Sequence, residues 1–190
     1  MTDHHDVVVV GAGQAGLAIG YHLARARRRF LILEAADGPA AAARSRWDSL
    51  RLFTPVRYNS LPGMPFPGDP DHHPTRDEVV AYLTKYAERF GLPIQPNRRV
   101  TRLRPAERGY RIEAGGATYT ADQVVIATGP FQTPRTPAFA AELAPHVDQL
   151  HSADYRRPSQ IADGPVLVVG GGNTADQIAD ELAGTHEVHL

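Results

Sequence analysis

Short apolar runs alternate with helical patterns along the first part of the chain. Three short segments consist mostly of Val, Ile and Leu: residues 6–10 (DVVVV), 30–34 (FLILE) and 124–127 (VVIA). Runs without polar alternation are typical of parallel strands buried on both faces of a sheet. Apolar residues recur at helical spacing over residues 15–28. The segment 6–34 therefore predicts a strand–turn–helix–strand unit, with the right-handed crossover that such units adopt.

Prolines and glycines interrupt this pattern over residues 35–71, so long regular elements are not expected there. A loop of this length inside a compact domain usually serves a function. Thr75 and Glu78 then have the spacing of a capping box, which predicts the start of an amphipathic helix. The helix is expected to run to Phe90 and to end before Gly91.

A small antiparallel meander is predicted next, after which the opening pattern repeats. The meander strands are expected at residues 99–107, 110–114 and 117–120, with glycines at one turn. Beyond a proline-rich connection, a second strand, glycine turn, helix and strand are expected at residues 166–169, 170–174, 175–183 and 187–190. The fold class is therefore α/β, with one Rossmann-like domain over residues 1–164 and the start of another over residues 165–190. Because one helix does not complete such a domain, we expect the N-terminal part of a longer enzyme.

The first glycine turn, residues 11–16 (GAGQAG), lies between the predicted strand and helix. In a GxGxxG turn the first glycine permits the sharp bend, the second admits a pyrophosphate, and the third permits close helix–strand packing. Glu34 lies 18 residues beyond Gly16, where a carboxylate accepts hydrogen bonds from ribose hydroxyls and repels a 2′-phosphate. We therefore predict that the ADP half of FAD binds at Gly11, Gly13, Gln14, Ala15, Gly16 and Glu34.

A second FAD contact and a second dinucleotide site are also predicted. Residues 127–129 (Ala127, Thr128 and Gly129) resemble the ATG signature at which two-dinucleotide flavoproteins return to the FAD site. Gly170 and Gly172 belong to a repeated fingerprint, GGGNTA, in which alanine replaces the third glycine. Two dinucleotide sites in one chain imply that electrons pass from a nicotinamide to a flavin. The residues themselves leave NADPH and NADH as alternatives.

Several segments together resemble the flavin-containing monooxygenase superfamily, including its bacterial and plant YUCCA-type members. They are residues 46–55 (RWDSLRLFTP), 61–67 (LPGMPFP), 151–155 (HSADY) and 170–174 (GGGNT), and the resemblance extends from Val7 to Leu190. It implies an FAD- and NADPH-dependent monooxygenase, in which a flavin C4a-peroxide delivers one oxygen atom of O₂ to a small organic substrate. It also implies that FAD is lined by Arg46, Trp47, Leu52 and Thr54, that the Val100 backbone meets the adenine, and that Asn173 and Thr174 lie beside the NADPH pyrophosphate.

The sequence departs from this family in two places. Pro55 follows Thr54 where the animal-type enzymes carry an asparagine at the flavin edge, so that polar contact must come from elsewhere. Pro145 and Val147 stand where the long FxGxxxH signature has Phe and Gly, although His151 is present. Two alternative functions stay open: a cysteine-free NAD(P)H-dependent flavin or ferredoxin-type reductase, and a non-catalytic FAD-binding fragment, which the expected incompleteness of the second domain favours. A dithiol reductase is excluded because the chain has no cysteine.

Composition narrows the remaining function classes. The 20 Lys and Arg residues nearly balance the 21 Asp and Glu residues, so neither a nucleic acid nor a membrane surface is expected as a partner. No apolar stretch is long enough for a membrane span, and the polar start lacks the features of a signal peptide, so we expect a cytoplasmic protein. The histidine pair at residues 4–5 is expected in a frayed terminus, and the pair at residues 72–73 lies in a proline-rich loop without spaced carboxylate partners. No metal site is therefore predicted. His151 and Tyr155 are interpreted as a structural link between domains rather than an acid–base pair.

Overall fold

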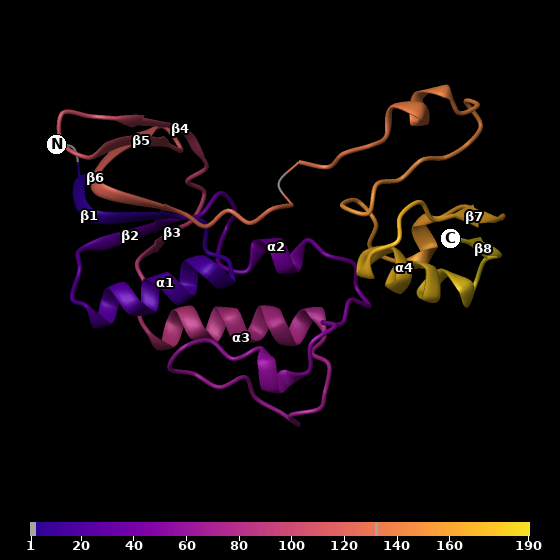
Figure 1. Cartoon of the computed structure of the whole chain (residues 1–190), viewed down its shortest axis with the longest axis horizontal. Coiled ribbons are helices and arrows are strands. Elements are labelled where there is room, and N and C mark those ends of the chain that lie inside the picture. Colours follow the sequence, from indigo (N-terminus) through magenta and orange to yellow (C-terminus); the bar gives the residue numbers. More distant parts are fainter. Residues whose placement is uncertain (1–2, 132) are drawn as a thin grey trace.

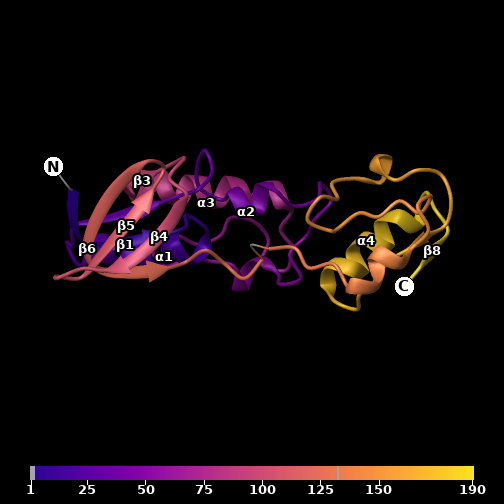
Figure 2. The same cartoon turned by 90° about the horizontal axis from the view of Figure 1, so that it is seen from above.

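The computed structural model describes residues 3–131 and 133–190. Two lobes lie at opposite ends of its long axis (Figure 1). The N-terminal lobe is built on a six-stranded sheet, and the C-terminal lobe on a two-stranded sheet and one helix. Figure 2 shows the same separation from above, with the large sheet at one end and the helix α4 (Asn173–Ala183) at the other.

The predicted strand–turn–helix–strand unit is confirmed as β1 (Asp3–Val10), α1 (Gln14–Arg25) and β2 (Phe30–Leu33). The two strands pair in parallel. The first strand begins three residues earlier than predicted, and the expected frayed start is wrong, because residues 3–5 pair with residues 119–121. The helix ends three residues earlier than predicted, because Arg27 adopts a left-handed φ of 52°. The N–H of Arg27 donates to the carbonyl of Ala24, and the N–H of Arg28 donates to the carbonyl of Leu23. This is the Schellman pattern that turns a chain out of a helix.

Four further strands complete the sheet: β3 (Ile94–Gln95), β4 (Val100–Pro105), β5 (Tyr110–Ala114) and β6 (Ala117–Ile126). The strand order is β3-β2-β1-β6-β5-β4. The meander is confirmed in β4 (Val100–Pro105), β5 (Tyr110–Ala114) and the start of β6 (Ala117–Ile126). The prediction of separate strands at residues 117–120 and 124–127 is wrong, because β6 is continuous. It pairs antiparallel with β5 and parallel with β1. The two-residue strand β3 (Ile94–Gln95), which pairs with β2, was not predicted because it is too short to show a periodicity.

Helices and meander cover opposite faces of the parallel strands. On one face, Leu17 of α1 and Tyr86 of α3 (Arg76–Arg89) pack against Val9 and Ile32. On the other, the meander residue Ile112 packs against Val8 and its neighbours. Figure 1 shows α1 and α3 side by side beneath the sheet, with the meander above it. Residues 7–10 of β1 and all of β2 are therefore buried on both faces, as their composition predicted. The same prediction for residues 124–127 is wrong, because Val124 and Val125 are only half-buried and Ile126 is 62% exposed at the end of β6.

The capping box of α3 is confirmed. The Thr75 hydroxyl accepts the N–H of Glu78 at 3.3 Å, and a Glu78 carboxylate oxygen accepts the N–H of Thr75 at 2.8 Å. Hydrogen bonds from His72 and from the Thr75 backbone lower the pKa of Glu78 to about 2. The buried Tyr82 hydroxyl donates to the carbonyl of Met64 at 2.7 Å. The proline-rich segment is therefore held against α3 by hydrogen bonds as well as by packing. Its helical elements are the short helix α2 (Ala41–Arg44) and one 3₁₀ turn.

The C-terminal lobe has the elements that the repeated pattern predicted, with different bounds. They are β7 (Val166–Leu167), α4 (Asn173–Ala183) and β8 (Val188–His189), with β7 and β8 parallel. The helix begins two residues earlier than predicted, because Gly172 is its N-cap. The hydrophobic core of this lobe also includes Tyr155 and Trp47, which precede residue 164 in the sequence. The domain boundary after residue 164 therefore stays a prediction. No helix within the described residues is long and apolar enough to cross a membrane.

Candidate functional site

The first glycine turn is shaped by close backbone packing. Gly11 has a φ of +106°, and a Cβ there would lie 2.6 Å from the carbonyl oxygen of Ala127. A Cβ on Gly16 would lie 1.9 Å from the carbonyl oxygen of Gly11. At Gly13, by contrast, a Cβ would meet no described atom within 4 Å. The first and third glycines are therefore required by the fold, while the second leaves open space at the end of α1.

This open space lies at a helix end that no side chain caps. Gly13 is the N-cap of α1, and its carbonyl accepts the N–H of Leu17 at 3.0 Å. The amides of Gln14, Ala15 and Gly16 precede this bond and have no partner within the helix. Free amides at the positive end of a helix dipole form a site for a phosphate group. The structure therefore brings together five of the predicted FAD residues with the geometry that a diphosphate requires.

Glu34 follows β2 directly and is 9% exposed. One carboxylate oxygen accepts the N–H of Ala12 at 2.7 Å, and the other accepts the N–H of Ala36 at 2.9 Å. An ionised carboxylate has about four acceptor positions, so about two stay free for ribose hydroxyls. Glu34 thus secures the glycine turn through Ala12 and keeps acceptor capacity beyond these two bonds. The predicted ribose contact is compatible with this second role and stays a prediction.

The ATG segment closes the same site from β6. The N–H of Ala127 donates to the carbonyl of Val10 at 2.8 Å, and its own carbonyl faces Gly11. Thr128 and Gly129 follow on the surface, where Gly129 has a φ of +78°. The three predicted FAD segments therefore meet at the carboxyl ends of neighbouring parallel strands. Dinucleotides bind at such an edge in sheets of this kind.

Val100 lies at the border of this site. It is half-buried at the start of β4 and packs against the core on the meander side of the sheet. Two residues earlier, the N–H of Arg98 donates to the carbonyl of Glu34 at 2.7 Å. The start of β4 is thereby fixed next to the residue predicted to bind the ribose. Its contact with adenine stays a prediction.

The segment of residues 46–54 lies between the two lobes, and its predicted FAD residues are spread along it. The Arg46 guanidinium carbon lies 5.3 Å from the centre of the Phe131 ring. Trp47 is 3% exposed and packs against the C-terminal lobe, and its Nε1 has no partner among the described residues. Leu52 is half-buried, and its N–H bonds the carbonyl of Pro74. Their roles toward FAD stay predictions.

Thr54 has a polar partner that the sequence did not reveal. Its hydroxyl donates to Oδ1 of Asn59 at 2.8 Å, and Nδ2 of Asn59 donates back to the Thr54 carbonyl at 2.8 Å. The asparagine that the animal-type enzymes carry after this threonine is Pro55 here. Asn59 therefore supplies an amide beside Thr54 from five positions along the chain. The 3₁₀ turn at residues 56–58 brings it there, and no motif signalled that turn.

The second glycine turn has the same open N-terminus as the first. Gly170 has a φ of +137°, and Gly172 is the N-cap of α4 without a side-chain cap. A Cβ at Gly172 would meet no described atom within 4 Å. Asn173 and Thr174 form the first turn of the helix. The four predicted NADPH residues therefore surround a second helix end that is suited to a diphosphate.

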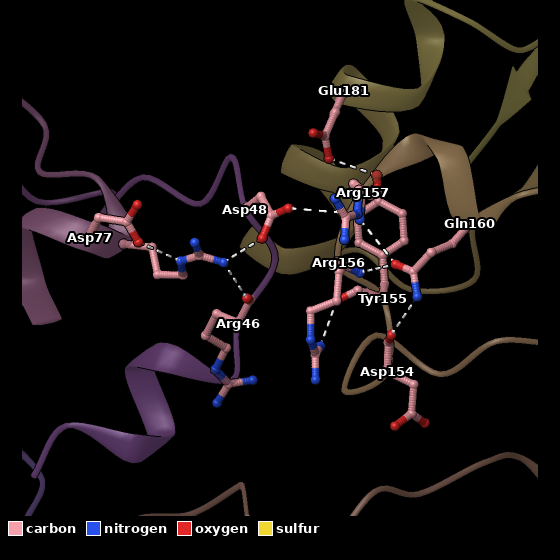
Figure 3. Close-up of polar contacts among 10 residues, drawn as sticks. Arg46, Asp48, Asp77, Asp154, Tyr155, Arg156, Arg157, Gln160 and Glu181 are labelled. Carbon is pink, nitrogen blue, oxygen red and sulfur yellow. Dashed lines mark hydrogen bonds and ion pairs between the residues drawn. The ribbon is translucent and has the colours of Figure 1, made fainter. Parts of the chain in front are cut away.

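The lobes meet across a cleft of about 510 Å³. Both lobes contribute to its lining, which consists of Ser49, Arg51, Leu52, Phe53, His73, Gln177, Asp180 and Glu181. Beside it, the buried Tyr155 hydroxyl donates to a carboxylate oxygen of Glu181 at 2.6 Å (Figure 3). Burial, and then this carboxylate, raise the pKa of Tyr155 well above its usual value. Nδ1 of His151 accepts the N–H of Ala153 within the same turn. Both side chains thus have structural partners.

This fold and its two glycine turns define an α/β protein of the dinucleotide-binding class. The chain belongs to the pyridine nucleotide-disulphide oxidoreductase family, whose model matches residues 8–190. It is 46% identical over 185 residues to the uncharacterized oxidoreductase CzcO-like of Geobacillus kaustophilus, covering 97% of this chain and 53% of that protein. It is 33% identical over 183 residues to indole-3-pyruvate monooxygenase YUCCA1 of Oryza sativa, covering 92% of this chain and 44% of that protein.

Comparison with solved structures also finds flavin-containing monooxygenases. The structure of a flavin-containing monooxygenase from Stenotrophomonas maltophilia matches with a TM-score of 0.92 and 37% identity, covering 98% of this chain and 57% of that one. These likenesses confirm the resemblance to the flavin-containing monooxygenases and the Rossmann-like fold class. The chain spans about half the length of the relatives that it matches.

Proposed function

We propose that the protein is an FAD-dependent oxidoreductase that uses NADPH to oxygenate a small organic substrate with O₂. The observation that carries this proposal is the pair of open helix N-termini, at Gly13 and at Gly172, in one chain. The Stenotrophomonas flavin-containing monooxygenase, at 37% identity over nearly the whole chain, supports the same assignment. A steroid monooxygenase described as bound to NADP, with 28% identity and a TM-score of 0.75, supports the choice of nicotinamide nucleotide.

The residues present fit these two cofactors in different ways. The amides after Gly13 would bind the FAD diphosphate, while Glu34 would accept the ribose hydroxyls. The amides after Gly172 would bind the NADPH diphosphate, with Asn173 and Thr174 beside it. Bound flavin supplies the hydride acceptor and the centre that reacts with O₂. The protein's own part is to hold the two nucleotides in position and to exclude water from the cleft between the lobes.

The test is NADPH turnover by the purified protein in the presence of FAD and candidate substrates. We expect NADPH oxidation, a product that carries one atom of ¹⁸O from ¹⁸O₂, and less H₂O₂ than NADPH consumed. Equimolar H₂O₂ with every substrate would contradict oxygenation. Rapid electron transfer to an artificial acceptor without oxygenated product would instead favour the reductase, and flavin that NADPH never bleaches without oxygen would favour the non-catalytic alternative.

A further inference from the structure

The polypeptide at residues 50–52 is an extended segment with hydrogen bonds on both sides. On one side, the Leu50 carbonyl accepts the N–H of Arg76 at 2.9 Å, and the Leu52 N–H donates to the Pro74 carbonyl at 2.8 Å. Arg51 and Thr75 are thereby paired as an isolated antiparallel bridge. In such a pair, the N–H and C=O of the central residue point to the opposite side. The backbone groups of Arg51 therefore face away from the N-terminal lobe.

The side-chain amide of Gln177 takes the place of a neighbouring strand on that side. The Arg51 N–H donates to Oε1 of Gln177 at 3.2 Å, and Nε2 of Gln177 donates to the Arg51 carbonyl at 2.9 Å. Both backbone groups of one residue are thus bound by one amide, although 126 positions separate the two residues. A glutamine amide has the donor and the acceptor that this arrangement needs.

Gln177 lies four residues beyond Asn173, so the two side chains project from the same face of α4 in successive turns. Arg51 lies one residue before Leu52 and three before Thr54. The amide pair therefore joins the helix predicted to hold NADPH directly to the segment predicted to line FAD. It also borders the cleft between the lobes.

Neighbouring contacts leave this segment little freedom to shift. The Arg76 guanidinium donates to the Asp48 carboxylate at 2.5 Å and to the Arg46 carbonyl at 3.2 Å. The N–H of Asp48 donates to the Arg156 carbonyl at 2.8 Å. Figure 3 shows Asp48 between the N-terminal lobe and the connector, which is the chain between the two lobes (residues 133–165). Arg157 of the connector approaches Asp48 from the side opposite Arg76. Trp47 packs against α4 from the same segment. Gln177 therefore acts on a segment that is already held at its beginning.

We propose that Gln177 is a positioning residue, which fixes α4 against residues 50–52 and so aligns the nicotinamide with the flavin for hydride transfer. This inference rests on the proposed function. Hydride transfer depends steeply on the distance and angle between the reacting carbons, because a misplacement of about 1 Å can lower a rate about 100-fold. Arg51 is exposed, so water can satisfy its backbone groups when the amide is removed. Alignment is then lost while the fold is kept.

The test compares anaerobic flavin reduction in three variants of the FAD-loaded protein. Gln177→Met keeps the shape of the side chain and removes both hydrogen bonds, and Gln177→Glu keeps only an acceptor for the Arg51 N–H. Gln149→Met is the matched control, because Gln149 is exposed and bonds a carbonyl within the connector. At saturating NADPH we expect Gln177→Met to reduce flavin about tenfold more slowly, Gln177→Glu to be intermediate, and Gln149→Met to match the wild type. The dissociation constants for FAD and NADPH should change less than about twofold.

The outcomes separate this inference from the proposed function. Wild-type flavin that NADPH never reduces would overturn the proposed function, and the inference with it. Wild-type reduction with an equal limiting rate in Gln177→Met would overturn the inference alone. An increase in the NADPH concentration needed for half-maximal rate, with an unchanged limiting rate, would also overturn it, because Gln177 would then affect binding or folding and not alignment.

Discussion

The two glycines at the start of α1 have opposite structural surroundings, and we predict opposite effects of adding a methyl group to each. Gly13 has φ −81° and ψ −173°, which alanine adopts without strain. Its Cβ would meet no described protein atom within 4 Å. A Cβ on Gly16 would lie 1.9 Å from the Gly11 carbonyl oxygen. Gly13→Ala should therefore weaken FAD binding, whereas Gly16→Ala should destabilise the fold.

The magnitudes follow from these contacts. In the absence of FAD, Gly13→Ala loses about 0.5–1 kcal/mol as a helix N-cap and gains about 0.4–1 kcal/mol from a less flexible unfolded chain. Its unfolding free energy should thus stay within about 1 kcal/mol of the wild type. Its methyl would displace the FAD phosphate from charge-assisted hydrogen bonds worth about 1.5–3 kcal/mol. The dissociation constant for FAD should rise about 10- to 100-fold. Gly16→Ala should lose about 3 kcal/mol of stability from overpacking.

The assay pairs calorimetric titration with FAD and urea unfolding of the FAD-free protein. Gly171→Ala is a control, since its Cβ also enters open space but at the second turn. It should leave FAD affinity unchanged. Wild-type FAD affinity in Gly13→Ala would refute the placement of the diphosphate at the end of α1.

Three further predictions concern Glu34 and the cap of α3. Glu34→Ala leaves the N–H groups of Ala12 and Ala36 without their acceptor. The unfolding free energy should therefore fall by about 1–3 kcal/mol, and the affinity for FAD should fall as well. An unchanged unfolding free energy in urea together with an unchanged FAD affinity by calorimetry would contradict this. Thr75→Ala should cost about 1 kcal/mol in a urea titration, whereas no loss would mean that the cap does not stabilise the helix. Because the pKa of Glu78 is lowered from 4.5 to about 2, its contribution is complete above pH 4.5 and is lost as the pH falls toward 2. The stability difference between the wild type and Glu78→Gln should shrink over that interval, and a difference independent of pH would contradict it.

Local patterns predicted the parts of this fold that depend on neighbouring residues. The strand–turn–helix–strand unit is encoded within residues 6–34, and the cap of α3 within residues 75–78. Both were predicted. The continuity of β6 was not, because the polar residues Thr120, Asp122 and Gln123 interrupt its apolar pattern. Those residues belong to the strand because β1 pairs with residues 119–126 of β6. Tertiary pairing thus overrides the local signal, as it also does for β3.

The candidate site divides in the same way. Both glycine turns and Glu34 were predicted from spacing, since each residue type there has a backbone or charge requirement. The amide pair of Gln177 with Arg51 was not, because a single side chain that bonds a distant backbone leaves no periodicity in the sequence. Asn59 beside Thr54 was missed for the same reason. The packing of Trp47 against α4 depends on how the two lobes meet, which the sequence pattern does not contain.

The central claim is that the glycine turn and Glu34 bind the ADP half of FAD, and direct titration of the protein with FAD tests it. Trp47 is the single tryptophan of the chain, so quenching of its emission reports binding alongside the heat measured by calorimetry. We predict uptake of one FAD per chain, displacement of FAD by excess ADP, and much weaker displacement by ADP that carries a 2′-phosphate. A colourless protein that takes up no FAD, or equal displacement by both nucleotides, would contradict the claim.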